Sequence, residues 1–363
     1  LGARARVGTR GAKRVGARAF GHDAAQPASC VSSLAGGRRH HTAAAAVAAA
    51  AAVLAAASMA AKVRDKELIE TLSSLALDGD APSPTLSLDL ATLGLDGCVV
   101  DNILTAAECA HIIETTERAN GFSFWDPEGA DAKKRSHRNA DTCEFSGAAL
   151  CASLWPRLQP FVAARWSLAA DASEARCHEP ELEGGEWVAT GLNEHLLVNR
   201  YGAGGHFAPH ADGSTVVDFN RRSLFTVLVY LNDVAEGGAT QLLSEEEREC
   251  VIVHDPLSGA AVASAKAVLH AVAPRAGRAL VYWHQTMHAG APVGAGCAKY
   301  CVRSDVMYER APPRLTAPNE RRAFETYQEA LALEAAGDAM AALPLYMRVG
   351  KLSAEVARVF RLV

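Results

Sequence analysis

The stretch from Tyr201 to Gly213 reads YGAGGHFAPHADG. It holds two histidines four residues apart, His206 and His210, and an aspartate, Asp212, two residues after the second. On an extended strand, residues two apart project to the same face, so His210 and Asp212 present an imidazole and a carboxylate side by side. A third ligand, a histidine from another strand, would complete the 2-His-1-carboxylate site that binds non-haem Fe(II). The stretch therefore predicts a metal site that needs one more histidine.

Four later histidines could supply that ligand: His254, His270, His284 and His288. His254 lies in a loop-like segment, and His270 lies in a strand with no glycine-lined approach. The strand-like GRALVYW ends just before His284, whereas small residues and a proline follow His288 and allow the backbone to turn under a metal. We expect His206 to lie at the turn before its strand and to face solvent. We predict that three residues bind the metal: His210, Asp212 and His288.

The composition is that of a globular protein with a sizeable core. The chain has 363 residues, of which 49% are hydrophobic and 21% are charged. Its nine cysteines are scattered, odd in number and include no CxxC pair. This usage argues against a disulfide framework or a cysteine zinc site, and it favours reduced thiols.

The N-terminal segment differs from the rest of the chain. Residues 1–61 carry eight Lys or Arg and one acid, Asp23, so they contribute +7 to a chain whose net charge is −5, which leaves −12 elsewhere. An acidic body argues against nucleic acid or an anionic membrane as the main partner. The alanine-rich run 43–61 could be a signal anchor, an organelle transit peptide or untranslated sequence. The first methionine is Met59.

We expect Met59 to be the true start and residues 1–58 to be a translated leader or, second, a truncated transit peptide. The expected location is cytoplasmic, or an organelle or the endoplasmic reticulum if the segment is a targeting sequence. Residues 59–103 are predicted to hold a helix over 65–77 and a linker.

Helices are predicted over 104–166. Thr105 followed by Glu108 is a capping box, and a second helix is expected to begin near Ser153, because Pro156 is best tolerated in a first turn. The charged run 128–138 reads as an exposed loop. From about 190 to 311 the period changes to two, and short strands separated by Gly, Pro, Asn and Asp follow one another.

These elements predict an α+β protein. Its core is a jelly roll, a double-stranded β-helix, with flanking N-terminal helices and a C-terminal helical hairpin. The hairpin, over 318–363, resembles one tetratricopeptide-type repeat. A single repeat cannot bury its own face, so we expect it to pack on the main domain, with docking of a protein partner as the alternative.

The motifs together resemble a known enzyme family. Six positions match, at the same offsets, the approach to the iron site of prolyl 4-hydroxylases and their relatives, the 2-oxoglutarate- and Fe(II)-dependent dioxygenases: Tyr201, Gly204, Phe207, Pro209, His210 and Asp212. The segment 222–243 resembles the following strand pair with its Gly-Gly-x-Thr turn. The segment 274–308 resembles the region of the distal histidine and the basic residue beyond it. The resemblance covers residues 104–308, and we predict a dioxygenase domain over 104–311.

The resemblance implies hydroxylation of a C–H bond, first of all in a prolyl residue of a peptide or protein, with succinate and CO2 as co-products. It implies Fe(II), 2-oxoglutarate, O2 and ascorbate as cofactors and cosubstrates. The distal carboxylate of 2-oxoglutarate needs a buried cation, because an unpaired buried charge is costly.

Lys299 is the expected cation. It lies eleven residues after His288, where the family places its basic residue nine or ten after. Arg303, on the same face of the strand, is the alternative unless it pairs with Asp305. Three aromatic residues could take part in the pocket or simply pack in the core: Tyr230 as a hydroxyl partner of the carboxylate, and Tyr201 and Trp283 as pocket walls. Thr240 could do no more than end a turn.

Two other classes of function stay open. One is a cupin-like jelly-roll metalloenzyme that does not use 2-oxoglutarate, and it would have no need for Lys299 or Tyr230. The other is a non-enzymatic jelly roll that binds a ligand or a partner. Release of succinate from 2-oxoglutarate separates both from the dioxygenase.

Overall fold

The computed structural model describes residue 77 and the ranges 83–126, 128–168, 184–244 and 251–362. The predicted leader, 1–58, lies outside these residues, and so does the helix predicted over 65–77 except for Leu77. No helix among the described residues is both long and apolar enough to span a membrane.

The larger of two main sheets has 11 strands, and its paired strands run antiparallel. Its main path runs, in order, through β1 (Thr85–Asp89), β2 (Gly97–Asp101), β16 (Ala279–Trp283), β11 (Arg221–Tyr230), β18 (Lys299–Arg310), β8 (His195–Tyr201), β5 (Asp141–Ser146) and β3 (Ser123–Phe124). Three further strands pair beside this path: β10 (Val216–Asp218), β7 (Gly185–Leu192) and β6 (Arg165–Leu168).

The smaller main sheet has five strands, in the order β15 (Val268–Val272), β12 (Thr240–Leu243), β17 (His288–Gly290), β9 (His206–His210) and β4 (Arg138–Asn139). A separate hairpin pairs β13 (Ile252–His254) with β14 (Ala261–Ala263). The Gly-Gly turn before β12 requires glycine, because Gly237 has a φ of +71° and an added Cβ would lie 2.1 Å from the carbonyl oxygen of Pro292.

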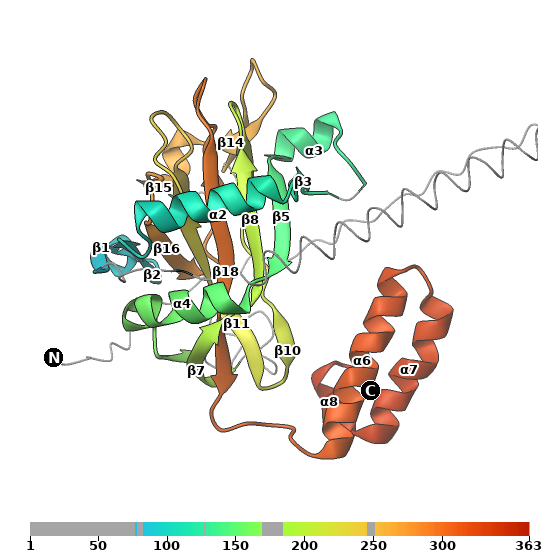
Figure 1. Cartoon of the computed structure of the whole chain (residues 1–363). Helices are drawn as coiled ribbons and strands as arrows, with labels where there is room; N and C mark the ends of the chain where they lie inside the picture. The colour runs from blue at the N-terminus through green and yellow to red at the C-terminus, as the bar shows by residue number, and fades with distance from the viewer. Residues whose placement is uncertain (1–76, 78–82, 127, 169–183, 245–250, 363) are drawn as a thin grey trace, which may run out of the picture. The chain divides into compact units, whose positions relative to one another are not determined.

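The two main sheets pack against each other. One buried cluster takes side chains from both, among them Tyr201, Tyr230 and Tyr282 from the larger sheet and Leu242 and Val272 from the smaller. A larger cluster lies on the other face of the 11-stranded sheet, which helices α2 (Ala106–Arg118) and α4 (Ala148–Leu158) cover (Figure 1). The larger sheet therefore has one face packed against the smaller sheet and the other covered by the two helices.

The capping box predicted for α2 is confirmed. Thr105 Oγ1 accepts from the backbone N–H of Glu108, and Glu108 Oε2 accepts from that of Thr105. The same carboxylate receives two hydrogen bonds of 2.9 Å from Arg157 of α4. Glu108 and Arg157 have only 5% and 10% of their side chains exposed, so this ion pair joins the two covering helices in a buried place.

The C-terminal segment contains α6 (Pro318–Ala335), α7 (Ala339–Leu352) and α8 (Ala354–Val359). Asp338 begins α7 by accepting a hydrogen bond from the backbone N–H of Ala341. Tyr327 of α6 stacks on Phe360, with ring centroids 3.7 Å apart.

Several boundaries differ from the sequence prediction. Strands β1 and β2 lie in 59–103, where a helix and a linker were predicted, and β3 to β6 lie among the helices predicted over 104–166. Helix α4 begins at Ala148 and not near Ser153, so Pro156 lies close to its end. There the proline removes only one backbone donor, and the helix stops two residues later. The loop predicted over 128–138 contains α3 (Ala132–His137), capped by Asp131.

Candidate metal centre

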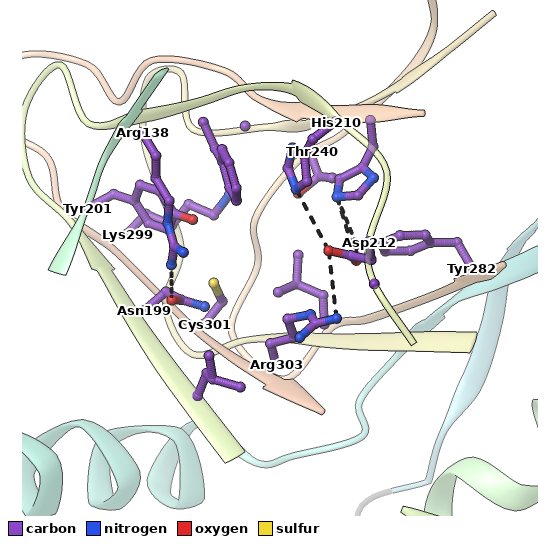
Figure 2. A pocket seen from close by; sticks show the side chains of 16 residues that line it. Arg138, Asn199, Tyr201, His210, Asp212, Thr240, Tyr282, Lys299, Cys301 and Arg303 are labelled. Atoms are coloured by element: carbon purple, nitrogen blue, oxygen red, sulfur yellow. Dashed lines mark hydrogen bonds and ion pairs between the residues drawn. The ribbon is translucent and has the colours of Figure 1, made fainter. Parts of the chain in front are cut away.

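The predicted metal ligands lie on and beside two paired strands of the smaller sheet. His210 is the last residue of β9 and His288 the first of β17, and the two are Cα partners. Asp212 follows β9 by two residues, and its backbone N–H donates to the carbonyl of His284. The structure brings His210, Asp212 and His288 together, with their donor atoms within 4.8 Å of one another. Figure 2 shows His210 beside Asp212.

Each histidine is oriented by the backbone carbonyl two residues before it. The Nδ1–H of His210 donates to the carbonyl oxygen of Ala208 at 2.8 Å, and that of His288 donates to the carbonyl of Thr286 at 2.9 Å. Because neutral imidazole carries a single N–H, both Nε2 atoms keep their lone pairs. Each Nε2 lies 3.7 Å from an oxygen of Asp212.

The two oxygens of Asp212 have different surroundings. Oδ2 accepts hydrogen bonds from the hydroxyls of Thr226, at 2.7 Å, and of Tyr282, at 2.8 Å. Oδ1 accepts no hydrogen bond among the described residues, and it faces His210 Nε2 and, at 3.6 Å, a guanidinium nitrogen of Arg303. Oδ1 is therefore the oxygen available to a metal.

Burial sets the charge of these groups. It lowers the pKa of His210 to about 3, helped by the nearby His288, and it also holds the pKa of His288 below its ordinary value. For Asp212, burial raises the pKa, but His288 and Arg303 outweigh burial and keep the pKa below its usual range. At neutral pH the site therefore offers two neutral imidazoles and one carboxylate.

These donors fit an Fe(II) ion. Two imidazole nitrogens and one carboxylate oxygen form the ligand set of non-haem Fe(II) oxygenases, which leaves coordination positions open for substrates. Within the described ranges no other group of His, Cys, Asp and Glu brings three donor atoms this close.

A cavity of about 260 Å³ opens beside the centre, between the two main sheets. Its walls come from β8, β11, β16 and β18 of the larger sheet and from β4, β9, β12 and β17 of the smaller. Figure 2 shows three cations among its lining residues: Arg138, Lys299 and Arg303. The cavity is therefore suited to an anionic ligand next to the metal.

Lys299 is buried, with only 3% of its surface exposed. Its ammonium donates to the carbonyl oxygen of Gly238 at 2.7 Å and lies 5.3 and 5.4 Å from the ring centroids of Tyr201 and Tyr230. Among the described residues no carboxylate forms an ion pair with it, and burial lowers its pKa. A buried ammonium without an anionic partner is costly, and an anion in the cavity would relieve that cost.

The other predicted cofactor residues fall into different places. Tyr201 lines the cavity, whereas Tyr230 does not and donates its hydroxyl hydrogen to Thr240 at 2.8 Å. Thr240 lines the cavity as well. Arg303 is paired with two carboxylates, Asp305 at 3.2 Å and Asp212 at 3.6 Å.

Trp283 does not line the cavity. It lies on the opposite face of β16, where its ring stacks on Trp166 at 5.6 Å and packs edge-on against Phe225. Its neighbour Tyr282 faces the metal centre instead. Of the two roles left open for Trp283, pocket wall and core packing, the structure therefore favours core packing.

His206 is buried, so the expectation that it faces solvent was wrong. Its ring nitrogens lie 3.0 Å from the carbonyl of Gly204 and 2.9 Å from that of Ser136, in the last turn of α3. It takes no part in the three-residue cluster. His254 and His270 also lie outside that cluster.

The sequence analysis missed three residues that act on the site. Thr226 and Tyr282 hold Asp212, and Arg138 enters the cavity from the segment predicted to be an exposed loop. Arg138 donates to Asn199 at 2.7 Å, and its guanidinium lies over the ring of Phe207 at 4.8 Å. No local signal identifies Tyr282, because a turn separates the end of β16, at Trp283, from β17, which begins at His288 in the other sheet.

Comparison with known proteins gives one sequence match. Residues 196–304 match the profile of the 2OG-Fe(II) oxygenase superfamily, and this segment includes all three predicted metal ligands and Lys299. No curated protein sequence matches the chain.

Comparison with solved structures found similarity to three prolyl hydroxylases, among others. A viral collagen prolyl hydroxylase from Paramecium Bursaria Chlorella virus-1, in its 2OG complex, is 18% identical and aligns over 58% of this chain and 94% of its own, with a TM-score of 0.33. A Pseudomonas putida prolyl-4-hydroxylase is 15% identical over 61% of this chain and 95% of its own, with a TM-score of 0.34.

The third is a prolyl hydroxylase from Trichoplax adhaerens in complex with a hypoxia inducible factor oxygen degradation domain peptide fragment. It is 17% identical over 61% of this chain and 86% of its own, with a TM-score of 0.36. TM-scores this low support no argument from any one structure, so the family assignment comes from the sequence match and the residues within it. The resemblance to this enzyme class is confirmed by that match, and residues 196–304 are the part of the chain that carries it.

Proposed function

We propose that the chain is an Fe(II)- and 2-oxoglutarate-dependent dioxygenase that hydroxylates a C–H bond, first of all in a prolyl residue of a peptide or protein. In this proposal the two facing sheets are the halves of a double-stranded β-helix. One substrate C–H bond, O2 and 2-oxoglutarate give the hydroxylated product, succinate and CO2. The prolyl substrate rests on the motif running from Tyr201 to Asp212, which resembles that of prolyl 4-hydroxylases.

One observation carries the use of 2-oxoglutarate. The buried Lys299 lines the same cavity as His210, Asp212 and His288, and among the described residues it has no carboxylate partner. A dicarboxylate with one end at the metal and the other at Lys299 would satisfy both the open metal positions and the buried ammonium.

The chain's own residues have separate tasks in this proposal. His210, Asp212 and His288 would hold Fe(II), which together with 2-oxoglutarate and O2 supplies the oxidising chemistry, with ascorbate keeping the metal reduced. Lys299 binds and orients the distal carboxylate. Thr226 and Tyr282 hold one oxygen of Asp212 away from the metal. The walls of the cavity exclude bulk water, which strengthens each of these electrostatic contacts.

The test is turnover of 2-oxoglutarate with added Fe(II), ascorbate and proline-rich peptides. We expect succinate to form, and we expect peptide mass spectrometry to show one added oxygen atom on a proline. Succinate release without a hydroxylated proline would contradict the prolyl substrate and retain the dioxygenase. Metal binding with no succinate under any condition would favour a cupin-like metalloenzyme that does not use 2-oxoglutarate.

A substitution of Lys299 tests the anchor. A charge-assisted hydrogen bond contributes about 1.5–3 kcal/mol, so Lys299→Met should raise the apparent KM for 2-oxoglutarate roughly 10- to 150-fold. Methionine keeps the length of the side chain, and the metal ligands are untouched, so Fe(II) titration should stay normal. The comparison variant is Arg303→Ala, because Arg303 is already paired with Asp212 and Asp305. A large rise in KM for Arg303→Ala and none for Lys299→Met would transfer the role to Arg303.

A further inference from the structure

A chain of hydrogen bonds runs behind Asp212, away from the cavity. Thr226 Oγ1 lies 2.7 Å from Asp212 Oδ2 and 2.9 Å from His284 Nδ1. His284 Nε2 lies 2.8 Å from Ser223 Oγ, which accepts a hydrogen bond of 2.8 Å from the backbone N–H of Thr215. Ser223, Thr226 and His284 are buried, and none of the three lines the cavity. These three side chains can therefore affect a molecule or ion bound in the cavity only through Asp212.

The direction of every hydrogen bond in this chain is determined. An ionised carboxylate only accepts, so the single hydroxyl hydrogen of Thr226 must be donated to Asp212. Thr226 Oγ1 must then accept from His284, which puts the imidazole hydrogen on Nδ1. His284 Nε2 is left as an acceptor for the Ser223 hydroxyl, whose oxygen accepts from the backbone of Thr215. Burial lowers the pKa of His284 to about 4, in agreement with a neutral ring.

We propose that His284 is a positioning residue for the metal centre, acting through Thr226 on Asp212. By donating to Thr226 Oγ1, His284 commits the Thr226 hydrogen to Asp212 Oδ2 and leaves Oδ1, which faces His210 Nε2, free of hydrogen bonds among the described residues. The backbone carbonyl of His284 also accepts from the N–H of Asp212 at 2.9 Å, so one residue fixes both the main chain and the side chain of this ligand. The role rests on the proposed function, because it presumes a metal at the centre.

A histidine suits this position because the two nitrogens of its neutral ring act differently: one donates a hydrogen bond and the other accepts one. The site requires a donor toward Thr226 and an acceptor toward Ser223, on opposite sides of one side chain. Without the donor, Thr226 could turn its hydroxyl toward another acceptor, and Asp212 could rotate and present both oxygens to a metal. That rotation would remove an open coordination position. Residues that orient metal ligands in this way typically change metal affinity 10- to 100-fold when they are lost.

The experiment is a titration of the full metal-free chain with Co(II) alone, followed by calorimetry and by the visible absorption of the bound ion. We expect His284→Leu to weaken Co(II) binding roughly 10- to 100-fold and to change the absorption spectrum. Asparagine is nearly the same size as leucine, but its amide can keep a hydrogen-bond donor near the position of Nδ1. His284→Asn should therefore retain most of the Co(II) affinity that His284→Leu loses. His206→Leu is the control, because His206 is a buried histidine outside the cluster of metal ligands.

A double-variant cycle separates positioning from simple packing. Thr226→Val keeps the shape of threonine and removes the hydroxyl, so it should lose as much affinity as His284→Leu. The combined variant should lose no more than Thr226→Val alone, since His284 acts through Thr226. Additive losses would overturn the proposal, as would equal Co(II) affinity in His284→Leu and the unchanged chain.

Two further outcomes are informative. If His284→Leu does not fold, Ser223→Ala carries the test. It leaves the ring in place but removes the partner of Nε2, and it should weaken Co(II) binding and alter the spectrum. An unchanged titration for Ser223→Ala would then count against the role. If the unchanged chain binds no Co(II), the proposed function itself fails, and that result is distinct from failure of the His284 role.

Discussion

Asp212→Ala is expected to abolish turnover and to prevent stoichiometric binding of Fe(II). The carboxylate is the only anionic donor of the three-residue cluster, and without it two neutral imidazoles are left to hold a divalent cation. His210→Ala and His288→Ala should have the same outcome, because each removes one of two nitrogen donors. The measurement is one Fe(II) per chain by metal analysis for the unchanged protein, together with succinate formation for each variant.

The comparison variant for these changes is His206→Ala. His206 lies four residues before His210 on the same strand, but its ring nitrogens contact backbone carbonyls and not the centre. We expect His206→Ala to keep most of the activity and all of the bound iron. Loss of iron in His206→Ala together with its retention in His210→Ala would show that the ligands are assigned wrongly.

Arg157→Ala is expected to destabilise the fold by about 3–5 kcal/mol, because it leaves the buried carboxylate of Glu108 without its cation. Two hydrogen bonds of 2.9 Å to Glu108 and one of 3.0 Å to the carbonyl of Ile103 disappear together. Urea unfolding at pH 7 measures the loss. The matched variant, Glu108→Leu with Arg157→Met, removes both charges and should cost less than Arg157→Ala alone. An Arg157→Ala protein as stable as the unchanged protein would contradict this prediction.

The same pair predicts a dependence on pH. Burial raises the pKa of Glu108, but hydrogen bonds from Arg157 and Thr105 outweigh it, so the pKa in the folded state lies below its ordinary value. A lowered carboxyl pKa stabilises the fold above the unfolded value, about 4.3, and this stabilisation is lost as pH falls through the folded pKa. The stability difference between Arg157→Ala and the unchanged protein should therefore shrink below about pH 4. A constant difference down to pH 3 would argue against this account.

Much of the strand order in the second half was visible in the sequence. The strand region predicted from about 190 to 311 contains β8, β11, β12, β16 and β18, because apolar alternation and the Gly, Pro, Asn and Asp breaks mark half-buried strands. The two outer strands β1 and β2 were missed. Both lie in the region 59–103, where a helix and a linker were predicted. Strand β1 is largely exposed, so its apolar residues do not mark it as a half-buried strand.

The side of the sheet that a residue faces was harder to predict. All five residues of β16 are buried, because the strand lies between neighbours with a packed core on each face. Polarity then no longer distinguishes the faces, and the choice between Tyr282 and Trp283 could not be made from hydrophobicity. Arg138 was missed for a different reason. It joins the cavity only because β4 pairs with β9 from far along the chain, and local sequence does not encode that pairing.

The opposition of His210 and His288 on paired strands has a consequence for folding. A slip of β17 against β9 by one residue would turn one imidazole to the other side of the sheet and destroy the site. Metal binding by this site would therefore depend on strand register, because only the correctly aligned sheet could chelate an ion and slipped pairings would gain nothing from it. Since a ligand that binds only the native state stabilises it in proportion to the logarithm of its concentration, a bound ion would favour the correct alignment during refolding. The time course of Co(II) absorbance after dilution from denaturant would thus report when these two distant segments reach their final alignment.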